Sequence, residues 1–254
     1  TADSIREAEV LVVRTRTLCN ASLLHGSDIK IIATATIGRD HIDEEWCKSH
    51  EIKVISAPGC NAPAVGESVY DALKYWAKKN QINLSKEKIA IIGYGHVGHE
   101  VEKKALSLGM AVELIDPYVE GCRSCVEEVI EQCTVVTYHV PLNKSTYHLC
   151  NDETLKSMNR HGLLINAARG GVVDEVALLN WLRNNPEANA AIDCWEGEPD
   201  INKELAKRVL IGTPHIAGYS VEGKWQGTRM VVEAIKQHYG WKWEIEEASR
   251  EFLN

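Results

Sequence analysis

Apolar residues along the chain follow two alternating patterns. Short runs rich in β-branched residues are separated by longer segments in which apolar residues recur every three or four positions. This alternation is typical of a parallel α/β architecture, in which each strand is followed by a helix that returns the chain to the same edge of the sheet. The sequence therefore predicts an α/β protein built on parallel sheets.

Three of the short runs lie near the amino terminus and predict one small sheet. They are Glu9–Arg14, Ile29–Ala33 and Ile52–Ser56. The period then changes, because the next apolar residues fall on one face of a helix of about four turns. These residues are Val65, Val69, Leu73 and Trp76. We expect this helix to lead out of the first domain.

A second series of runs predicts a larger sheet. Its strands are expected at Lys88–Gly93, Ala111–Asp116, Val135–Val140, Leu163–Ala167, Ala190–Trp195 and Val209–Gly212. Parallel strands with helices between them favour a Rossmann-type, doubly wound sheet. The segment Lys224–His238 has helical period again, and we place it back on the first domain. We therefore expect a Rossmann domain over residues 63–217 and a smaller flavodoxin-like α/β substrate domain formed by residues 1–62 and 218–254.

The bulk composition favours a packed protein that binds neither membranes nor nucleic acid. The 254 residues are 44% hydrophobic, and the formal net charge is −8. A negative chain is poorly suited to collect nucleic acid or anionic lipid, so any phosphate site must be small and local. No apolar run approaches the roughly 18 residues that cross a bilayer, and the polar start of the chain does not resemble a signal peptide. We expect a cytoplasmic protein.

The eight cysteines are spread through a chain with ample aliphatic residues, which favours reduced thiols that serve in packing. Cys122 and Cys125 have the spacing of a redox or zinc pair. No second pair and no histidine cluster accompanies them, as a zinc site would require. We expect no metal site.

A glycine-rich motif follows the strand expected at Lys88–Gly93. In a dinucleotide-binding turn, the first glycine permits the tight turn, the second lets the backbone approach the pyrophosphate, and the third allows the helix to pack closely. The amino terminus of that helix then faces the phosphates. The residues expected to bind a dinucleotide here are Gly93, Gly95, His96, Val97 and Gly98. The alternative is an ordinary strand-turn-helix with glycines at a crowded crossing.

Asp116 ends the next expected strand, 18 residues after Gly98. A carboxylate at this position accepts hydrogen bonds from the adenine-ribose hydroxyls. It also repels a 2′-phosphate, so the sequence favours NAD over NADP. Arg123 is the nearby cation that would favour NADP if its loop folded back over the site.

Three polar segments come at the carboxyl ends of later strands, where open α/β sheets bind ligands. They are Asn166–Asp174 (NAARGGVVD), Asp193–Pro199 (DCWEGEP) and Thr213–Gly218 (TPHIAG). The imidazole of His215 titrates in the range that suits a catalytic acid or base. The carboxylate of Glu198 would fix the tautomer of the ring, and the forked guanidinium of Arg169 matches a substrate carboxylate.

These segments resemble the signature segments of the D-isomer-specific 2-hydroxyacid dehydrogenases, in the order and spacing of that family. The resemblance implies that Arg169 holds the substrate carboxylate and carbonyl, that His215 is the acid/base, and that Glu198 pairs with His215. It also implies that Asp193 contacts the nicotinamide. The residues that it places beside the cofactor are Ala167, Ala168, Arg169, Asp193, Gly218 and Tyr219.

Two loops of the first domain resemble one branch of this family, which oxidises 4-phospho-D-erythronate on the route to pyridoxal phosphate. They are Thr34–Asp43 (TATIGRDHID) and Pro58–Val65 (PGCNAPAV). The resemblance implies a small phosphorylated 2-hydroxy acid as the substrate. The residues that it implies for substrate binding are Arg14, Thr15, Thr36, Ile37, Gly38 and Arg169. Arg16 and Arg39 depart from the branch pattern, and we expect them to be surface charges.

Members of this branch dimerise through a domain that would follow Asn254, and they begin with a strand that would precede Thr1. We therefore expect a homodimer, and we expect that the chain is truncated at both ends. The stretches at 121–124 and 143–146 are also short for the family. This leaves open whether Cys122 and Cys125 are neighbours in the intact protein.

Two alternatives stay open. Another D-2-hydroxyacid dehydrogenase would act on phosphoglycerate, glycerate or hydroxypyruvate. A non-catalytic NAD-sensing protein would instead bind partner peptides, as corepressors with this fold do. The presence of Arg169, Glu198 and His215 together favours an enzyme.

Overall fold

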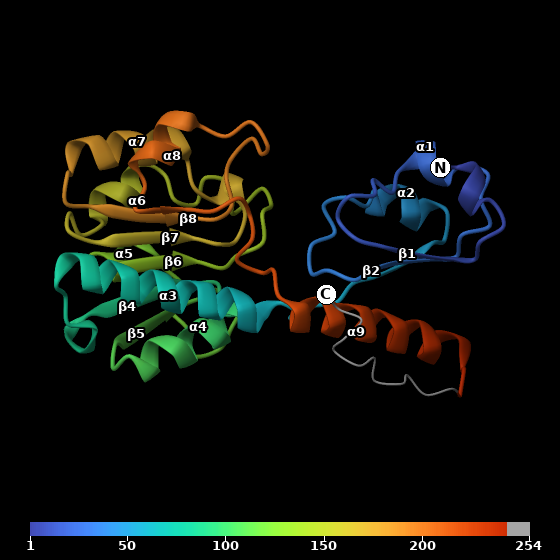
Figure 1. Ribbon diagram of the computed structural model, residues 1–254, viewed down its shortest axis with the longest axis horizontal. Helices are drawn as coiled ribbons and strands as arrows, with labels where there is room; N and C mark the ends of the chain where they lie inside the picture. The colour runs from blue at the N-terminus through green and yellow to red at the C-terminus, as the bar shows by residue number, and fades with distance from the viewer. Residues whose placement is uncertain (243–254) are drawn as a thin grey trace. The chain divides into compact units, whose positions relative to one another are not determined.

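The computed structural model describes residues 1–242, which divide into two compact units (Figure 1). Unit 1 consists of Thr1–Asn61 and the described part of Tyr219–Asn254, and unit 2 consists of Ala62–Gly218. Each unit has a parallel β-sheet of its own. The predicted α/β fold with parallel sheets is confirmed.

Unit 1 is built on a three-stranded sheet in the order β1-β2-β3. The strands are β1 (Val10–Val13), β2 (Ile31–Thr34) and β3 (Lys53–Ile55), preceded by a short 3-10 turn at Asp3–Ile5. All of β2 is buried, because helices cover both faces of this central strand. The helices are α1 (Ala21–Leu24) and α2 (Glu44–Ser49) on the face of Ile32, and α9 (Val221–Tyr239) on the face of Ile31 and Ala33.

Helix α9 is longer than the predicted Lys224–His238 because its ends are set by caps. The Ser220 hydroxyl accepts a hydrogen bond from the Gly223 amide at 2.9 Å, and Gly240 ends the helix in the left-handed conformation. A Cβ at Gly227 would lie only 2.7 Å from the carbonyl oxygen of Ala35. The helix therefore packs tightly against the end of β2 within unit 1.

Unit 2 contains a six-stranded parallel sheet in the order β5-β4-β6-β7-β8-β9. The strands are β4 (Lys88–Ile92), β5 (Ala111–Ile115), β6 (Val135–Tyr138), β7 (Leu163–Asn166), β8 (Asn189–Ile192) and β9 (Ile211–Gly212). The chain passes from β4 outward to β5 and then crosses back to β6, so the strand order reverses at β4. Ligands of open α/β sheets bind at such a reversal.

The last strand is shorter than the predicted Val209–Gly212. Val209 instead ends the preceding helix, α8 (Lys203–Arg208), and its amide donates to the carbonyl oxygen of Leu205. Only Ile211 and Gly212 remain to pair with β8. The apolar run is therefore divided between a helix cap and a strand, a division that hydrophobicity alone does not reveal.

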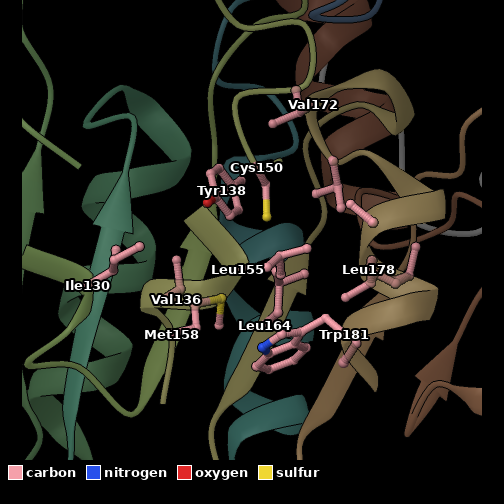
Figure 2. Close-up of a cluster of buried hydrophobic side chains, with 14 of the residues drawn as sticks. Ile130, Val136, Tyr138, Cys150, Leu155, Met158, Leu164, Val172, Leu178 and Trp181 are labelled. Carbon is pink, nitrogen blue, oxygen red and sulfur yellow. The ribbon is translucent and has the colours of Figure 1, made fainter. Parts of the chain in front are cut away.

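Alternate residues of the unit 2 strands pack against different layers of helices. Ile89 and Ile91 of β4 share a core with α3 (Ala62–Asn80) and α4 (His96–Ser107). Ala90 and Ile92 face the opposite core, shown in Figure 2, where Tyr138, Leu155, Leu164 and Trp181 are buried together. The helices on that side are α5 (Glu127–Ile130), α6 (Asp152–Ser157), α7 (Glu175–Asn184) and α8.

Helix α3 contains the apolar face predicted from Val65, and it begins at Ala62. A 3-10 turn at Leu84–Lys86 then leads into β4. Within residues 1–242, no helix combines the length and the apolar character that crossing a membrane requires.

Candidate active site

The turn between β4 and α4 contains three glycines with different physical roles. Gly93 has a φ of +94°, and a Cβ there would lie 2.7 Å from the carbonyl carbon of His139 at the end of β6. A Cβ at Gly98 would lie 2.4 Å from the carbonyl oxygen of Gly93. Both positions therefore need glycine for the packing of the protein itself.

Gly95 differs from the other two because a Cβ there would meet no atom within 4 Å. It is exposed, and it is the N-cap residue of α4, where no side chain within the described residues caps the helix. His96 and Val97 follow in the first turn, and Val97 packs partly into the core below. The amides of this turn and the open space beside Gly95 fit a dinucleotide phosphate.

Asp116 lies at the end of β5 beside this glycine turn. One carboxylate oxygen accepts a hydrogen bond from the Tyr94 amide at 2.9 Å, and the other accepts one from the Tyr118 amide at 3.0 Å. The guanidinium of Arg123, the cation that would favour NADP, instead faces Glu113 at 3.8 Å. The carboxylate of Asp116 is thus the charge that the structure fixes next to the turn.

His215 follows β9 and pairs with Glu198. The Nδ1 atom of His215 lies 2.8 Å from Oε2 of Glu198, while Oε1 of Glu198 accepts a hydrogen bond from the Trp195 amide at 2.5 Å. The two side chains are 43% and 32% exposed, so the pair is open to solvent within unit 2. Because Glu198 occupies Nδ1, Nε2 is the ring nitrogen left to exchange a proton with a ligand.

The backbone of His215 is left-handed, with a φ of +56°. This conformation costs a non-glycine residue roughly 1–2 kcal/mol, so neighbouring contacts must hold it. The carboxylate of Asp193, which is only 6% exposed, accepts hydrogen bonds from the amides of Ile216 (2.8 Å) and Ala217 (3.0 Å) and from the Thr213 hydroxyl (2.6 Å). The His215 amide donates to the backbone carbonyl of Asp193 at 2.8 Å. Asp193 therefore binds the turn on both sides of the histidine.

Arg169 lies on the loop after β7, where its Nη1 donates to the carbonyl oxygen of Ala168 at 2.8 Å. Asn166, which is 1% exposed, holds this loop. Its Nδ2 donates to the carbonyl oxygens of Arg169 (3.0 Å) and Cys194 (3.3 Å), and its Oδ1 accepts from the Ala168 amide (3.2 Å). Sequence reasoning quoted Asn166 within a motif but assigned it no role.

The loops after β7 and β8 also touch backbone to backbone. A Cβ at Gly170 would lie 1.9 Å from the carbonyl oxygen of Trp195, so this position requires glycine. Gly170 opens a 3-10 turn at Gly170–Val172 that leads to α7. Ala167 and Asp193 also line a cleft of about 470 Å³ between α3 and the ends of β7 to β9. The carboxyl edge of the sheet thus brings Arg169, Asp193, Glu198 and His215 onto adjoining loops.

Three further side chains join these loops and were not found from the sequence. Glu175 is buried in the first turn of α7, and its carboxylate accepts a hydrogen bond from the Glu196 amide at 2.7 Å. The carboxylate of Glu196 lies 2.9 Å from Nε2 of His148. Each of these residue types is common on protein surfaces, and the three positions are far apart in the chain, so no sequence signal marks them.

The residues predicted for substrate binding in the first domain lie at the carboxyl ends of β1 and β2. Arg14 and Thr15 directly follow β1 and are exposed. The hydroxyl of Thr36 lies 2.7 Å from that of Thr34 and donates to the Gly38 carbonyl at 3.1 Å. The side chain of Ile37 packs partly against the core under α9.

The remaining cations of this region differ in their partners. Arg39 forms an ion pair with Glu44 at 3.2 Å, as expected for a surface charge. Arg14 lies near Cys60, a residue of the loop after β3. Burial raises the pKa of the Cys60 thiol, and the charge of Arg14 opposes that rise. Arg14 is thus placed beside the PGCN loop.

The last two residues predicted beside the cofactor lie where one unit ends and the other resumes. Gly218 is the final residue of unit 2 and Tyr219 the first of the second segment of unit 1. The ring of Tyr219 is exposed, with the Lys224 ammonium 5.1 Å from its centroid.

The cysteines are all free thiols, and Cys125 donates to a carboxylate oxygen of Glu127 at 3.3 Å. Among the described residues, no three side chains of the metal-binding types come together in a way that could hold an ion.

Comparison with known proteins identifies the family. Residues 66–217 match the model of the D-isomer specific 2-hydroxyacid dehydrogenase, NAD binding domain. An erythronate-4-phosphate dehydrogenase of Bacteroides thetaiotaomicron is 43% identical over 244 residues, which are 92% of this chain and 70% of that protein. The enzyme of the same name from Escherichia coli is 41% identical over 245 residues, which are 93% of this chain and 65% of that protein.

Solved structures agree with this relationship. The NAD-bound 3-phosphoglycerate dehydrogenase of Entamoeba histolytica is 25% identical and superposes with a TM-score of 0.84 over 98% of this chain and 85% of that chain. A D-lactate dehydrogenase of Aquifex aeolicus in complex with NAD and lactic acid is also 25% identical, with a TM-score of 0.77 over 94% of this chain and 85% of that chain. The resemblance seen in the sequence is confirmed. The chain belongs to the D-isomer-specific 2-hydroxyacid dehydrogenases, a family of oxidoreductases that use NAD.

Proposed function

We propose that the protein oxidises 4-phospho-D-erythronate to 2-oxo-3-hydroxy-4-phosphobutanoate, a step toward pyridoxal phosphate. The observation that carries the reaction is the pairing of His215 with Glu198 at 2.8 Å on a loop next to Arg169 and Asp193. The substrate is supported by the relatives named erythronate-4-phosphate dehydrogenase at 41–43% identity. The two solved structures named for lactate and 3-phosphoglycerate are each 25% identical.

The chemistry assigned to the chain is that of an acid/base and a carboxylate anchor. As the C–H bond of the secondary alcohol breaks, its hydride leaves for the nicotinamide of NAD, and Nε2 of His215 takes the hydroxyl proton. Glu198 binds the other ring nitrogen and so fixes the tautomer in which Nε2 can accept that proton. The guanidinium of Arg169 binds the carboxylate and the carbonyl that develops beside it.

We assign the two units corresponding roles. Unit 2 binds NAD through Gly93, Gly95, His96, Val97, Gly98 and Asp116. The nicotinamide side of the same site is assigned to Ala167, Ala168, Arg169, Asp193, Gly218 and Tyr219. Unit 1 is the substrate domain, with Arg14, Thr15, Thr36, Ile37 and Gly38 around the phosphorylated acid. The homodimer and the cytoplasmic location stay predictions from the sequence.

The test of the reaction is a comparison of acids with NAD. Formation of NADH is followed with 4-phosphoerythronate, 3-phosphoglycerate and glycerate at equal concentrations. We expect kcat/KM for 4-phosphoerythronate to exceed that for the other two by at least about tenfold, the factor that 1.4 kcal/mol of transition-state binding supplies. His215→Gln should abolish turnover while NAD still binds. Equal rates with 3-phosphoglycerate would refute the substrate assignment, and an active His215→Gln would refute the acid/base.

The test of the phosphate site uses two arginines of unit 1. Arg14→Ala should raise KM for 4-phosphoerythronate and leave the NAD dissociation constant unchanged, because only the phosphorylated acid meets Arg14. Arg39→Ala is the matched control, since Arg39 is already paired with Glu44. If Arg14→Ala raises KM for unphosphorylated erythronate by the same factor, Arg14 does not bind the phosphate.

A further inference from the structure

The placement of Glu198 depends on the turn that carries it, Trp195–Glu198. Each oxygen of the Glu198 carboxylate takes one hydrogen bond, from the Trp195 amide on Oε1 and from His215 on Oε2. The first bond lies within the turn itself. The direction in which Glu198 meets His215 is therefore set by whatever fixes the backbone of this turn.

One support of the turn is a buried carboxylate. Glu175 is 5% exposed, and its Oε1 accepts a hydrogen bond from the Glu196 amide at 2.7 Å. Helix α7 does not need this carboxylate as a cap, because the N-cap residue Asp174 already binds the amides of Val176 and Ala177. Glu175 thus reaches away from its own helix to the turn.

The energetics of Glu175 argue for a specific role. Burial raises the pKa of this carboxyl group, and the nearby charges of Glu196 and Glu198 raise it further, while the Glu196 amide acts in the opposite direction. Placing a carboxylate here is therefore unfavourable for folding. The charge-assisted hydrogen bond that Glu175 accepts from the Glu196 amide partly offsets this cost.

The second support acts on the side chain of the same residue. The Nε2 atom of His148 lies 2.9 Å from Oε1 of Glu196, and the Tyr147 hydroxyl donates to that oxygen at 3.3 Å. The other ring nitrogen of His148 lies 3.7 Å from a carboxylate oxygen of Asp174. The imidazole is thus held between carboxylates of two different loops.

The backbone of His148 has a conformation that neighbouring contacts must hold. Its φ is +50°, in the left-handed region that a non-glycine residue adopts at a cost. The His148 amide donates to the carbonyl oxygen of Gly171 at 2.8 Å, and the ring stacks on Tyr147 with centroids 4.0 Å apart. The loop before α6 is therefore joined to the turn of Glu198 through Glu196.

We propose that Glu175 and His148 are positioning residues that fix the Trp195–Glu198 turn, and with it the orientation of Glu198 toward His215. Glu196 is the residue on which both act, Glu175 through its amide and His148 through its carboxylate. This inference rests on the proposed roles of His215 and Glu198. It adds a second imidazole–carboxylate contact, between His148 and Glu196, that supports the first.

The experiment uses variants that remove one contact each. Glu175→Met removes the acceptor at similar volume, whereas Glu175→Gln keeps an oxygen that can accept from the Glu196 amide. His148→Phe keeps the ring that stacks on Tyr147 and removes the nitrogen. His161→Phe is the matched control, because His161 forms an ion pair with Glu187 on the surface of the same unit, with both side chains more than 70% exposed.

The main readout is the tautomer of His215, measured from the ring ¹⁵N shifts of histidine-labelled protein and assigned by the signal lost in His215→Gln. We expect one tautomer, protonated on Nδ1, in the wild type, in Glu175→Gln and in His161→Phe. Glu175→Met and His148→Phe should give a mixture, because Glu198 no longer faces Nδ1 in a fixed direction. In both, kcat should fall about tenfold, the effect of one lost charge-assisted hydrogen bond, with the NAD dissociation constant unchanged.

The outcomes separate this inference from the proposed function. A folded Glu175→Met and a folded His148→Phe that keep the single tautomer would overturn the inference, whatever their kcat. If Glu175→Met does not fold, His148→Phe decides alone, since it changes a partly exposed side chain. An active His215→Gln would defeat the proposed function, and the tautomer measurement would still test the support of Glu198.

Discussion

The substitution Asp193→Asn replaces one carboxylate oxygen by an NH₂ group next to the turn that carries His215. The two carboxylate oxygens of Asp193 accept from different backbone amides, Ile216 on Oδ1 and Ala217 on Oδ2. An asparagine side chain has one oxygen and one NH₂ group. In Asp193→Asn, one of the two amides must therefore face another donor.

The magnitude follows from the burial of these groups. Asp193 is 6% exposed and the Ala217 amide bond is buried, so a donor left without an acceptor costs about 1–3 kcal/mol. The same bonds offset the roughly 1–2 kcal/mol of the left-handed backbone at His215. We expect the free energy of unfolding of Asp193→Asn to fall by about 1–3 kcal/mol. Because 1.4 kcal/mol is a factor of ten, kcat should fall about tenfold to hundredfold.

The assay combines urea unfolding, steady-state kinetics and titration with NAD. Thr213→Val is the matched control, because it removes the hydroxyl bond to Oδ1 (2.6 Å) and leaves both amides in place. Its effects should be clearly smaller than those of Asp193→Asn. An unchanged kcat together with an unchanged free energy of unfolding would refute the reasoning, whatever the NAD affinity, since Asp193 would then not support the turn.

Four further substitutions test other parts of unit 2. Gly98→Ala should lower the free energy of unfolding by about 1–3 kcal/mol, because its Cβ would lie 2.4 Å from a carbonyl oxygen. Gly95→Ala, whose Cβ meets no protein atom, should keep the stability in denaturation and weaken only NAD in a titration. Burial lowers the pKa of His139 to about 3. Below pH 6.5, this imidazole therefore binds a proton in the unfolded chain but not in the native state. The wild type should lose about 2 kcal/mol of stability from this group between pH 7 and pH 5, and His139→Asn should not show that loss in urea unfolding. The raised pKa of Glu175 gives the opposite pH dependence, because burying its carboxylate lowers the free energy of unfolding only as the pH rises above the ordinary pKa of a carboxyl group. Glu175→Gln should therefore match the wild type at low pH and be more stable than it at neutral pH; an unchanged difference across the pH range would contradict this.

The fold was predictable where local chemistry and periodicity agree. The run Lys88–Ile92, the glycines after it and Asp116 follow one another at the spacing of a strand, a turn and a second strand end, and the structure places the glycine turn and Asp116 side by side. The requirement for glycine at Gly170 was not predictable, because it comes from the backbone of Trp195, a loop distant in the chain. The same holds for the contact between His148 and Glu196.

The bonds of Asp193 show another limit of sequence reasoning. Resemblance to a family implied a role toward the cofactor, and the carboxylate also binds the turn of His215. A motif states which residue types occur together, but it does not state how many hydrogen bonds one carboxylate shares between protein and ligand. Helix α9 differed for a related reason, since the caps Ser220 and Gly240 set its ends and the apolar period does not.

The division of unit 1 into two chain segments has a consequence for synthesis on the ribosome. Its strands are translated first, but α9, which covers Ile31 and Ala33 of β2, follows only after the whole of unit 2. At ordinary elongation rates this delay is about 10–30 s. Unit 2 is contiguous, and all of its helices are translated before α9. Unit 2 can therefore finish folding before unit 1, although the strands of unit 1 are translated earlier. A nascent chain of this protein therefore exposes an apolar sheet face that a chaperone can cover until α9 emerges.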